Sequence, residues 1–216
     1  MVVKNPAATI RDTLLYAKKY WDEKEYAEHT HTKKPHFDPK LEALRPVIKK
    51  EIPLKAHVLR TDDIFTAIRI ARECDVRLTL EHATEGGLIA DLLAEEGWPI
   101  AVGPYLGEGN RYEHRNQGYE NAVKLIKAGC MVSSMTDSVA IAEQYLTLCA
   151  GMLVREGLDE FEALKTITIH PAKHLGIEQR VGTLEKGRDA DLVLMHGSPF
   201  SITAKPKAVF IEGKRV

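Results

Sequence analysis

The stretch PLKAHVLRTDDIFTAIRIARECDVRLTLEH (53–82) contains two short apolar segments separated by an amphipathic one. PLKAHV (53–58) and RLTLEH (77–82) have the length and composition of β-strands. Between them, TDDIFTAIRIAREC (61–74) begins with a threonine and two acidic residues, which favour a helix N-terminus. Its apolar residues recur at helical spacing on one face: Ile64, Ala67, Ile68 and Ala71. The pattern predicts a strand–helix–strand unit.

The same order of elements continues towards the C-terminus. Further strands are predicted at 98–104 and 130–137. Helices are predicted at 88–96, 119–128 and 139–156. Strands that alternate with helices form parallel sheets with right-handed crossovers. The sequence therefore predicts four consecutive βα units in a parallel α/β sheet.

The flanking segments have other patterns. We predict an amphipathic helix over 7–28, an exposed, charged connection over 29–39 and a short helix over 41–50. From Val181 onward, segments punctuated by glycine and rich in β-branched residues predict a small antiparallel β unit.

Composition argues against several classes of protein. The 216 residues include 30 Lys+Arg and 31 Asp+Glu, so the formal net charge is −1 and no basic surface for nucleic acid or membrane is expected. No apolar run reaches the length of about 18 residues that spans a membrane, and the N-terminal MVVKNPAATIRD lacks the apolar core of a signal peptide. Three cysteines, Cys74, Cys130 and Cys149, are too few for a disulfide framework. We expect a cytoplasmic protein with buried, inert thiols.

Polar side chains lie at the ends of three predicted strands. His57 lies near the end of the first strand, His82 ends the second and Asp137 ends the fourth. The carboxyl ends of parallel strands meet at one edge of a sheet, where ligands bind. Imidazole and carboxylate are ligands of Zn²⁺ and similar divalent metals. A single histidine at a strand end is more often structural, so the metal site requires all three residues to converge.

Longer motifs resemble a known family. HPAKHLGIEQRVGTLEKGRDADLVLM (170–195) resembles the C-terminal signature of the metal-dependent amidohydrolase superfamily. Three segments resemble its imidazolonepropionase-related, prolidase-like branch: AHVLRTDDIFTAIRIARE (56–73), LEHATEGGLIADLLAEEGWPIAVGP (80–104) and EQYLTLCAGMLVREGLDEFEALKTITIHPAK (143–173). The resemblance covers roughly residues 50–216.

The resemblance implies a (β/α)8 TIM-type barrel with a small β-sandwich domain. The four units here resemble strands 5–8, so the C-terminal half of the barrel is expected over 1–180 and the C-terminal strands of the small β domain over 181–216. A complete barrel takes about 250 residues, and the family's strands 1–4 have no counterpart in this sequence. The family carries a pair of metal-binding histidines, spaced His-x-His, on strand 1. His29 and His31 have this spacing but follow no strand, and we interpret them as part of a solvated loop.

The resemblance also implies roles for the strand-end residues. His57 and His82 match the metal-binding histidines of strands 5 and 6, and Asp137 matches the aspartate of strand 8. They would hold Zn or another divalent metal such as Fe. Asp137 and His82 would be the catalytic residues, with Asp137 accepting a proton from the attacking water. Tyr105, at the end of the third strand, and His114, in the polar loop after it, are candidate substrate-binding residues; a surface position is the main alternative for His114.

Two functions remain open. The first is a metal-dependent hydrolase that cleaves an amide or peptide-like C–N bond, or an ester, of a small-molecule substrate. Arg60 stands where deaminase and imidazolonepropionase members carry a glutamate, which favours the peptidase-like or lactonase-like members. The alternative is a catalytically inactive half-barrel remnant that acts as a structural or interaction protein.

Four strands cannot close a barrel of eight. The strands 53–58 and 130–136 would each present an unpaired edge, and exposed edges are templates for association. Large aliphatic side chains are expected to face the uncovered barrel interior: Leu54, Leu78, Leu80 and Val132. We therefore expect self-association or a partner chain carrying barrel strands 1–4, and little activity from the isolated chain.

Overall fold

The computed structural model describes residues 5–106 and 112–216. Internal contacts divide the chain into two compact units. The first contains the chain up to Ala56 together with Asp62–Thr79, and the second contains His57–Thr61 and Leu80–Val216. The residues singled out at the strand ends all belong to the second unit.

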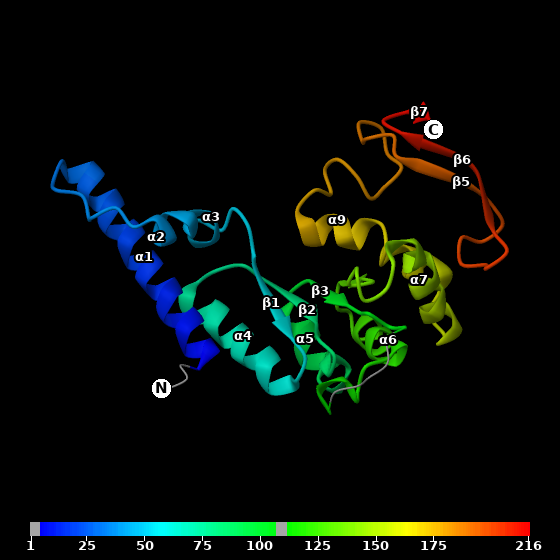
Figure 1. The fold of residues 1–216 in the computed structure, drawn as a ribbon, viewed down its shortest axis with the longest axis horizontal. Coiled ribbons are helices and arrows are strands. Elements are labelled where there is room, and N and C mark those ends of the chain that lie inside the picture. The colour runs from blue at the N-terminus through cyan, green and yellow to red at the C-terminus, as the bar shows by residue number, and fades with distance from the viewer. Residues whose placement is uncertain (1–4, 107–111) are drawn as a thin grey trace. The chain divides into compact units, whose positions relative to one another are not determined.

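The first unit is built on a long helix that contacts two short ones (Figure 1). The three are α1 (Pro6–Thr30), α2 (Pro39–Ala43) and α3 (Arg45–Ile48). Trp21 of α1 is buried, and its Nε1 donates a 3.0 Å hydrogen bond to a backbone carbonyl of α2. The prediction of a single helix over 41–50 is wrong, because a proline in the first turn of α3 has no N–H with which to continue α2.

Four strands form one sheet in the order β1-β2-β3-β4. The first three of them are labelled in Figure 1. Their bounds are β1 (Leu54–Val58), β2 (Leu78–His82), β3 (Ile100–Val102) and β4 (Val132–Ser134). The helical segments between them are α4 (Thr61–Cys74), the short η1 (Gly86–Leu88), α5 (Ala90–Glu96), η2 (Tyr112–His114) and α6 (Tyr119–Lys127). The predicted parallel α/β sheet is confirmed, with β3 and β4 shorter than predicted.

The two faces of the sheet differ in chemistry. The register aligns Leu80, Ile100 and Val132 in one row across β2, β3 and β4, and each is 0% exposed. Because side chains alternate along a strand, the next residue of each strand belongs to the opposite face. That row consists of Glu81, Ala101 and Ser133.

This apolar row corrects the prediction that the aliphatic side chains face an uncovered interior. Leu78, Leu80 and Val132 are fully buried, and Leu54 is half-buried. Alternation shows only that neighbouring residues face opposite ways, so the sequence could not tell which face is covered. The described residues therefore cover these aliphatic side chains without a partner chain.

Further helices and a second sheet follow β4. These elements are η3 (Glu143–Tyr145), α7 (Leu146–Arg155), α8 (Glu160–Lys165), α9 (Ile169–Leu175), β5 (Leu192–His196), β6 (Lys205–Ile211) and β7 (Lys214–Arg215). The predicted helix over 139–156 begins later, at Leu146. The antiparallel unit is confirmed as a sheet of order β5-β6-β7, while a domain boundary at residue 180 stays a prediction.

Among the described helices, none is both long enough and apolar enough to cross a membrane.

The buried row yields a stability prediction. Leu80→Ala should lower the free energy of unfolding by about 3 kcal/mol, because it leaves a cavity at a fully buried position. Leu88→Ala is the matched control: Leu88 is exposed, so its change should stay within about 0.5 kcal/mol. Urea denaturation followed by circular dichroism measures both. Equal, small effects would mean that the Leu80 face is uncovered after all.

Candidate functional site

Two imidazole rings meet at the carboxyl ends of β1 and β2. The ring centroids of His57 and His82 are 4.2 Å apart, with 36° between the ring planes. His57 is exposed and His82 is half-buried. The strand-end spacing predicted that these two side chains converge, and the structure brings them together.

The backbone leaves the strands in unusual conformations at this edge. His82 and Ala83, at the end of β2, have φ values of 70° and 42°, and Asp137, just beyond β4, has a φ of 49°. Left-handed backbone costs a non-glycine residue roughly 1–2 kcal/mol, and such residues cluster at functional sites. Two of the chain segments that carry predicted site residues therefore leave their strands through strained backbone.

A hydrogen bond fixes the orientation of the His82 ring. Its Nδ1 lies 2.8 Å from the carbonyl oxygen of Gly103. A carbonyl only accepts, so Nδ1 carries the proton and Nε2 keeps its lone pair. This is the arrangement typical of a metal-binding histidine.

Gly103 must be glycine in this position. Its φ is 150°, and a Cβ built on it would lie 2.0 Å from the carbonyl oxygen of Met135. The backbone beyond β3 therefore approaches the backbone beyond β4 more closely than any side chain allows. This close approach places the carbonyl that holds His82.

The surroundings of His57 favour its neutral form. Partial desolvation by neighbouring groups lowers the pKa of His57 most, and the nearby His82 and His114 lower it further. The carboxylates of Asp137 and Glu81 act in the opposite direction and raise it. The net effect is a lowered pKa, so His57 is a neutral imidazole at pH 7, the form that binds a metal ion.

The other predicted residues lie in different surroundings. Asp137 is exposed and influences the charge on His57. His114 is half-buried in η2 and also acts on His57. Tyr105 is buried, its Oη lies 3.5 Å from Oγ of Ser134, and burial raises its pKa. The substrate-binding roles of Tyr105 and His114 stay predictions.

The residues fit a divalent metal in chemistry but supply only part of a ligand set. Two adjacent imidazoles, one of them with Nδ1 fixed by a hydrogen bond, are suitable nitrogen ligands. Within residues 5–106 and 112–216, however, no group of three His, Cys, Asp or Glu side chains is arranged to hold a metal ion. The complete set of His57, His82 and Asp137 therefore stays a prediction.

Sequence reasoning missed two acidic residues next to the imidazoles. Oε1 of Glu81 lies 2.9 Å from Nε2 of His174, a buried residue of α9. Glu85 is also buried, and its carboxylate accepts hydrogen bonds from two other segments. The charge inside the apolar strand RLTLEH was an available signal for Glu81, whereas Glu85 looked like an ordinary loop residue.

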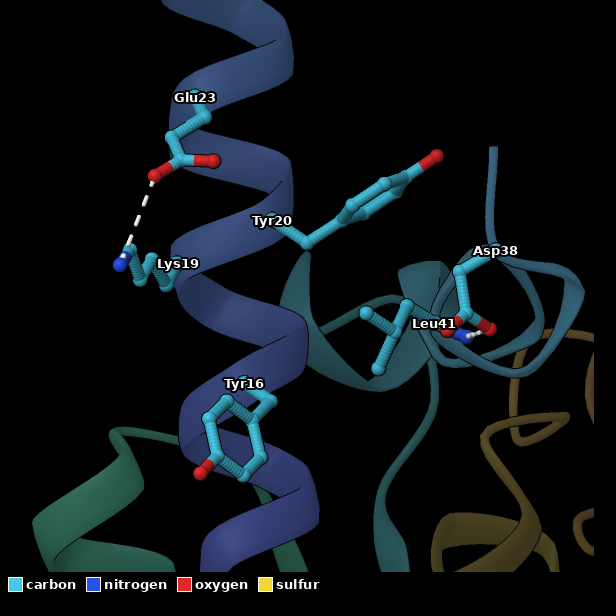
Figure 2. Close-up of a pocket in the computed structure, with 6 residues that line it drawn as sticks. All are labelled: Tyr16, Lys19, Tyr20, Glu23, Asp38 and Leu41. Atoms are coloured by element: carbon cyan, nitrogen blue, oxygen red, sulfur yellow. Dashed lines mark hydrogen bonds and ion pairs between the residues drawn. The ribbon is translucent and has the colours of Figure 1, made fainter. Parts of the chain in front are cut away.

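A separate groove of about 390 Å³ lies on the first unit (Figure 2). Its lining comes from α1 and from the segment around α2: Tyr16, Lys19, Tyr20, Glu23, Asp38 and Leu41. An ion pair of 3.7 Å joins Lys19 and Glu23 at its edge. None of the predicted site residues lines this groove.

Comparison with known proteins gives a consistent family. The amidohydrolase family model matches residues 13–216. An imidazolonepropionase of Acinetobacter baumannii is 34% identical over 148 residues, covering 66% of this chain and 35% of that protein. The amidohydrolase tasK of Hapsidospora irregularis is 26% identical over 180 residues, covering 82% of this chain and 18% of that protein.

Solved structures show the same relationship. An amidohydrolase from Thermotoga maritima has a TM-score of 0.91 and 38% identity, covering 97% of this chain and 55% of its own. A Xaa-Pro dipeptidase with bound methionine in its active site has a TM-score of 0.63 at 19% identity, covering 86% of this chain and 50% of its own. The second likeness concerns the fold alone. This chain thus spans about half of the solved chains and about a third or less of these curated relatives.

The surroundings of His57 predict how its pKa responds to substitutions nearby. His57 should titrate below the usual pH range of histidine, and Asp137→Asn should lower its pKa further, because the carboxylate favours the protonated ring. His82→Ala should raise it, because the electrostatic influence of His82 that lowers the pKa of His57 is removed. NMR titration of the histidine ring protons measures these shifts, with His36→Ala as a control on the other unit. An unshifted His57 in all variants would contradict the arrangement.

Proposed function

Because the chain belongs to the amidohydrolase family, we propose that it contributes to the hydrolysis of an amide or peptide-like C–N bond, or an ester, in a small molecule. The observation that carries this proposal is the His57–His82 pair, 4.2 Å apart, with Nδ1 of His82 held by a backbone carbonyl. That arrangement leaves nitrogen lone pairs at the edge of a parallel sheet, where such folds bind ligands.

Members of this family usually bind divalent metal ions. In our proposal His57, His82 and Asp137 would hold zinc, or another divalent ion such as iron, as part of a larger ligand set. A bound ion of this kind lowers the pKa of water towards 7.

The protein residues have distinct roles in this proposal. Asp137 is exposed at the strand end, so its carboxylate oxygen would accept the proton that an attacking water releases. The hydrogen bond from Nδ1–H of His82 to the Gly103 carbonyl holds the His82 ring in one orientation, so that Nε2 would stay available as a ligand. His114 and Tyr105 would contact the substrate, with His114 the better placed because it is less buried.

The rest of the site would come from outside these residues. We propose that the four strands correspond to the C-terminal half of the family's barrel, and that strands 1–4 come from a partner chain or are replaced by a second copy. The order β1-β2-β3-β4 supports this, because β1 and β4 each have one neighbour in the described sheet. Two imidazoles from this chain would then join ligands from the other half.

The open edges of the described sheet favour a second candidate function. β1 and β4 each have one neighbour in that sheet, and such edges can pair with another chain, as in a catalytically inactive structural or interaction protein. The two candidates differ in metal affinity, which can be measured without a known substrate.

The first test is zinc binding by the purified chain. Isothermal titration should show near-stoichiometric binding that His57→Ala weakens at least tenfold, because it removes one of the two paired imidazoles. His36→Ala, at an exposed position outside the pair, is the matched control and should leave the affinity unchanged. Absence of zinc binding, or equal effects of both variants, would favour the inactive candidate.

The second test concerns turnover. Light scattering should show a dimer or larger species. This complete assembly should then hydrolyse at least one member of a panel of N-acyl amino acids, dipeptides and lactones in a metal-dependent reaction. Asp137→Asn should reduce that rate at least a hundredfold, in line with typical general-base contributions, while circular dichroism stays unchanged. Full activity in this variant would place the proton acceptor elsewhere.

A further inference from the structure

We propose that Glu85 is a positioning residue that holds the segment Tyr112–Gly118, and with it His114, beside the imidazole pair. The catalytic consequence rests on the proposed function, whereas the positioning itself follows from contacts within the second unit. None of the roles assigned above to the strand-end residues requires Glu85.

The carboxylate of Glu85 joins two segments that are distant in sequence. Its side chain is only 9% exposed. Oε2 accepts a 3.0 Å hydrogen bond from the backbone N–H of Thr61, the first residue of α4. Oε1 accepts a 3.0 Å bond from Nδ2 of Asn116 and lies 3.9 Å from the guanidinium of Arg115. Burying a carboxylate is costly unless it is hydrogen-bonded, so these contacts together hold it in place.

The backbone around Glu85 is tied to the chain that follows His57. The N–H of Glu85 donates to the carbonyl of Leu59 at 2.9 Å, and the N–H of Ala83 donates to the carbonyl of Val58 at 2.9 Å. The connection after β2 therefore follows the connection after β1. Through Glu85, both are linked to the segment Tyr112–Gly118.

The far end of this segment lies against His82. Gln117 and Gly118 line a cavity of about 10 Å³ together with His82 and Pro104, which leaves room for one water at most. The side chain of Gln117 also donates a hydrogen bond to the carbonyl of Pro104. Pro104 directly follows Gly103, whose carbonyl binds His82. Movement of the segment would therefore change the surroundings of the imidazole pair directly.

The helix after the segment has an anchor of its own. Nδ2 of Asn121, in α6, donates to the carbonyl of Ala83 at 3.0 Å, and its Oδ1 accepts from the N–H of Gly87. Loss of the Glu85 carboxylate should therefore loosen Tyr112–Gly118 and leave α6 in place. This difference separates a positioning role from general support of the fold.

Amide hydrogen exchange of the full chain tests the proposal. Glu85→Gln removes the negative charge beside Arg115 and replaces one of the two acceptor oxygens with an NH₂ group, which weakens the contacts of residue 85 with the segment. Exchange of the bonded amides of Arg115 and Gln117 should become at least tenfold faster, with α6 and β4 unchanged. Glu85→Asp keeps the charge but is shorter, and should give a smaller acceleration. Glu113→Gln, at an exposed position of the same segment, is the matched control and should behave as wild type.

A second variant keeps the proposal testable if Glu85→Gln does not fold. Asn116→Ala removes only the contact on the segment side and should accelerate the same two amides. Unchanged exchange in Asn116→Ala, or equal acceleration throughout the second unit in either variant, would overturn the proposal.

Activity gives an independent readout. If hydrolysis is detected, Glu85→Gln should lower kcat/KM at least tenfold, and Glu85→Asp should recover part of it. A loosened segment in a protein without any hydrolytic activity would support the positioning role and contradict the proposed function. If Glu85→Gln loosens the segment but leaves kcat/KM unchanged, the catalytic consequence of the proposal is overturned.

Discussion

The hydrogen bond between Nδ1 of His82 and the carbonyl of Gly103 constrains the whole edge of the sheet. It requires the backbone after β3 to turn towards β2, and the same backbone lies so close to Met135, beyond β4, that only glycine fits. Three neighbouring strand ends are thereby locked together. The consequence for chemistry is that the His82 ring, 4.2 Å from the ring of His57, has its Nδ1 engaged and its Nε2 available as a ligand for a divalent ion.

The separation of the sheet into two faces supports this edge. One row, represented by Leu80, is packed to complete burial and supplies hydrophobic stability. The opposite row carries Glu81, which contacts the buried His174 of α9 and raises the pKa of His57. His82 lies two residues beyond Leu80 in β2, so the imidazole follows directly on the packed row at the end of the strand.

Periodicity was sufficient to predict the βα units and the convergence of His57 and His82, because equivalent positions at the ends of parallel strands must meet. It could not predict which face the helices cover, so the environment of Leu80 was assigned wrongly. Glu85 was missed because its partners lie 24 and 31 residues away, and a contact at that separation leaves no local pattern. Local patterns therefore predicted the architecture, whereas the site also depends on contacts between distant loops.

The most direct test of the site is the tautomer of His82, read from the ¹⁵N chemical shifts of its ring nitrogens in long-range ¹H–¹⁵N NMR spectra. The structure predicts that the neutral ring carries its proton on Nδ1, donates it to the Gly103 carbonyl and leaves Nε2 unprotonated. A neutral His82 protonated on Nε2 would contradict it, because the ring could then neither donate to that carbonyl nor offer Nε2 as a ligand beside His57.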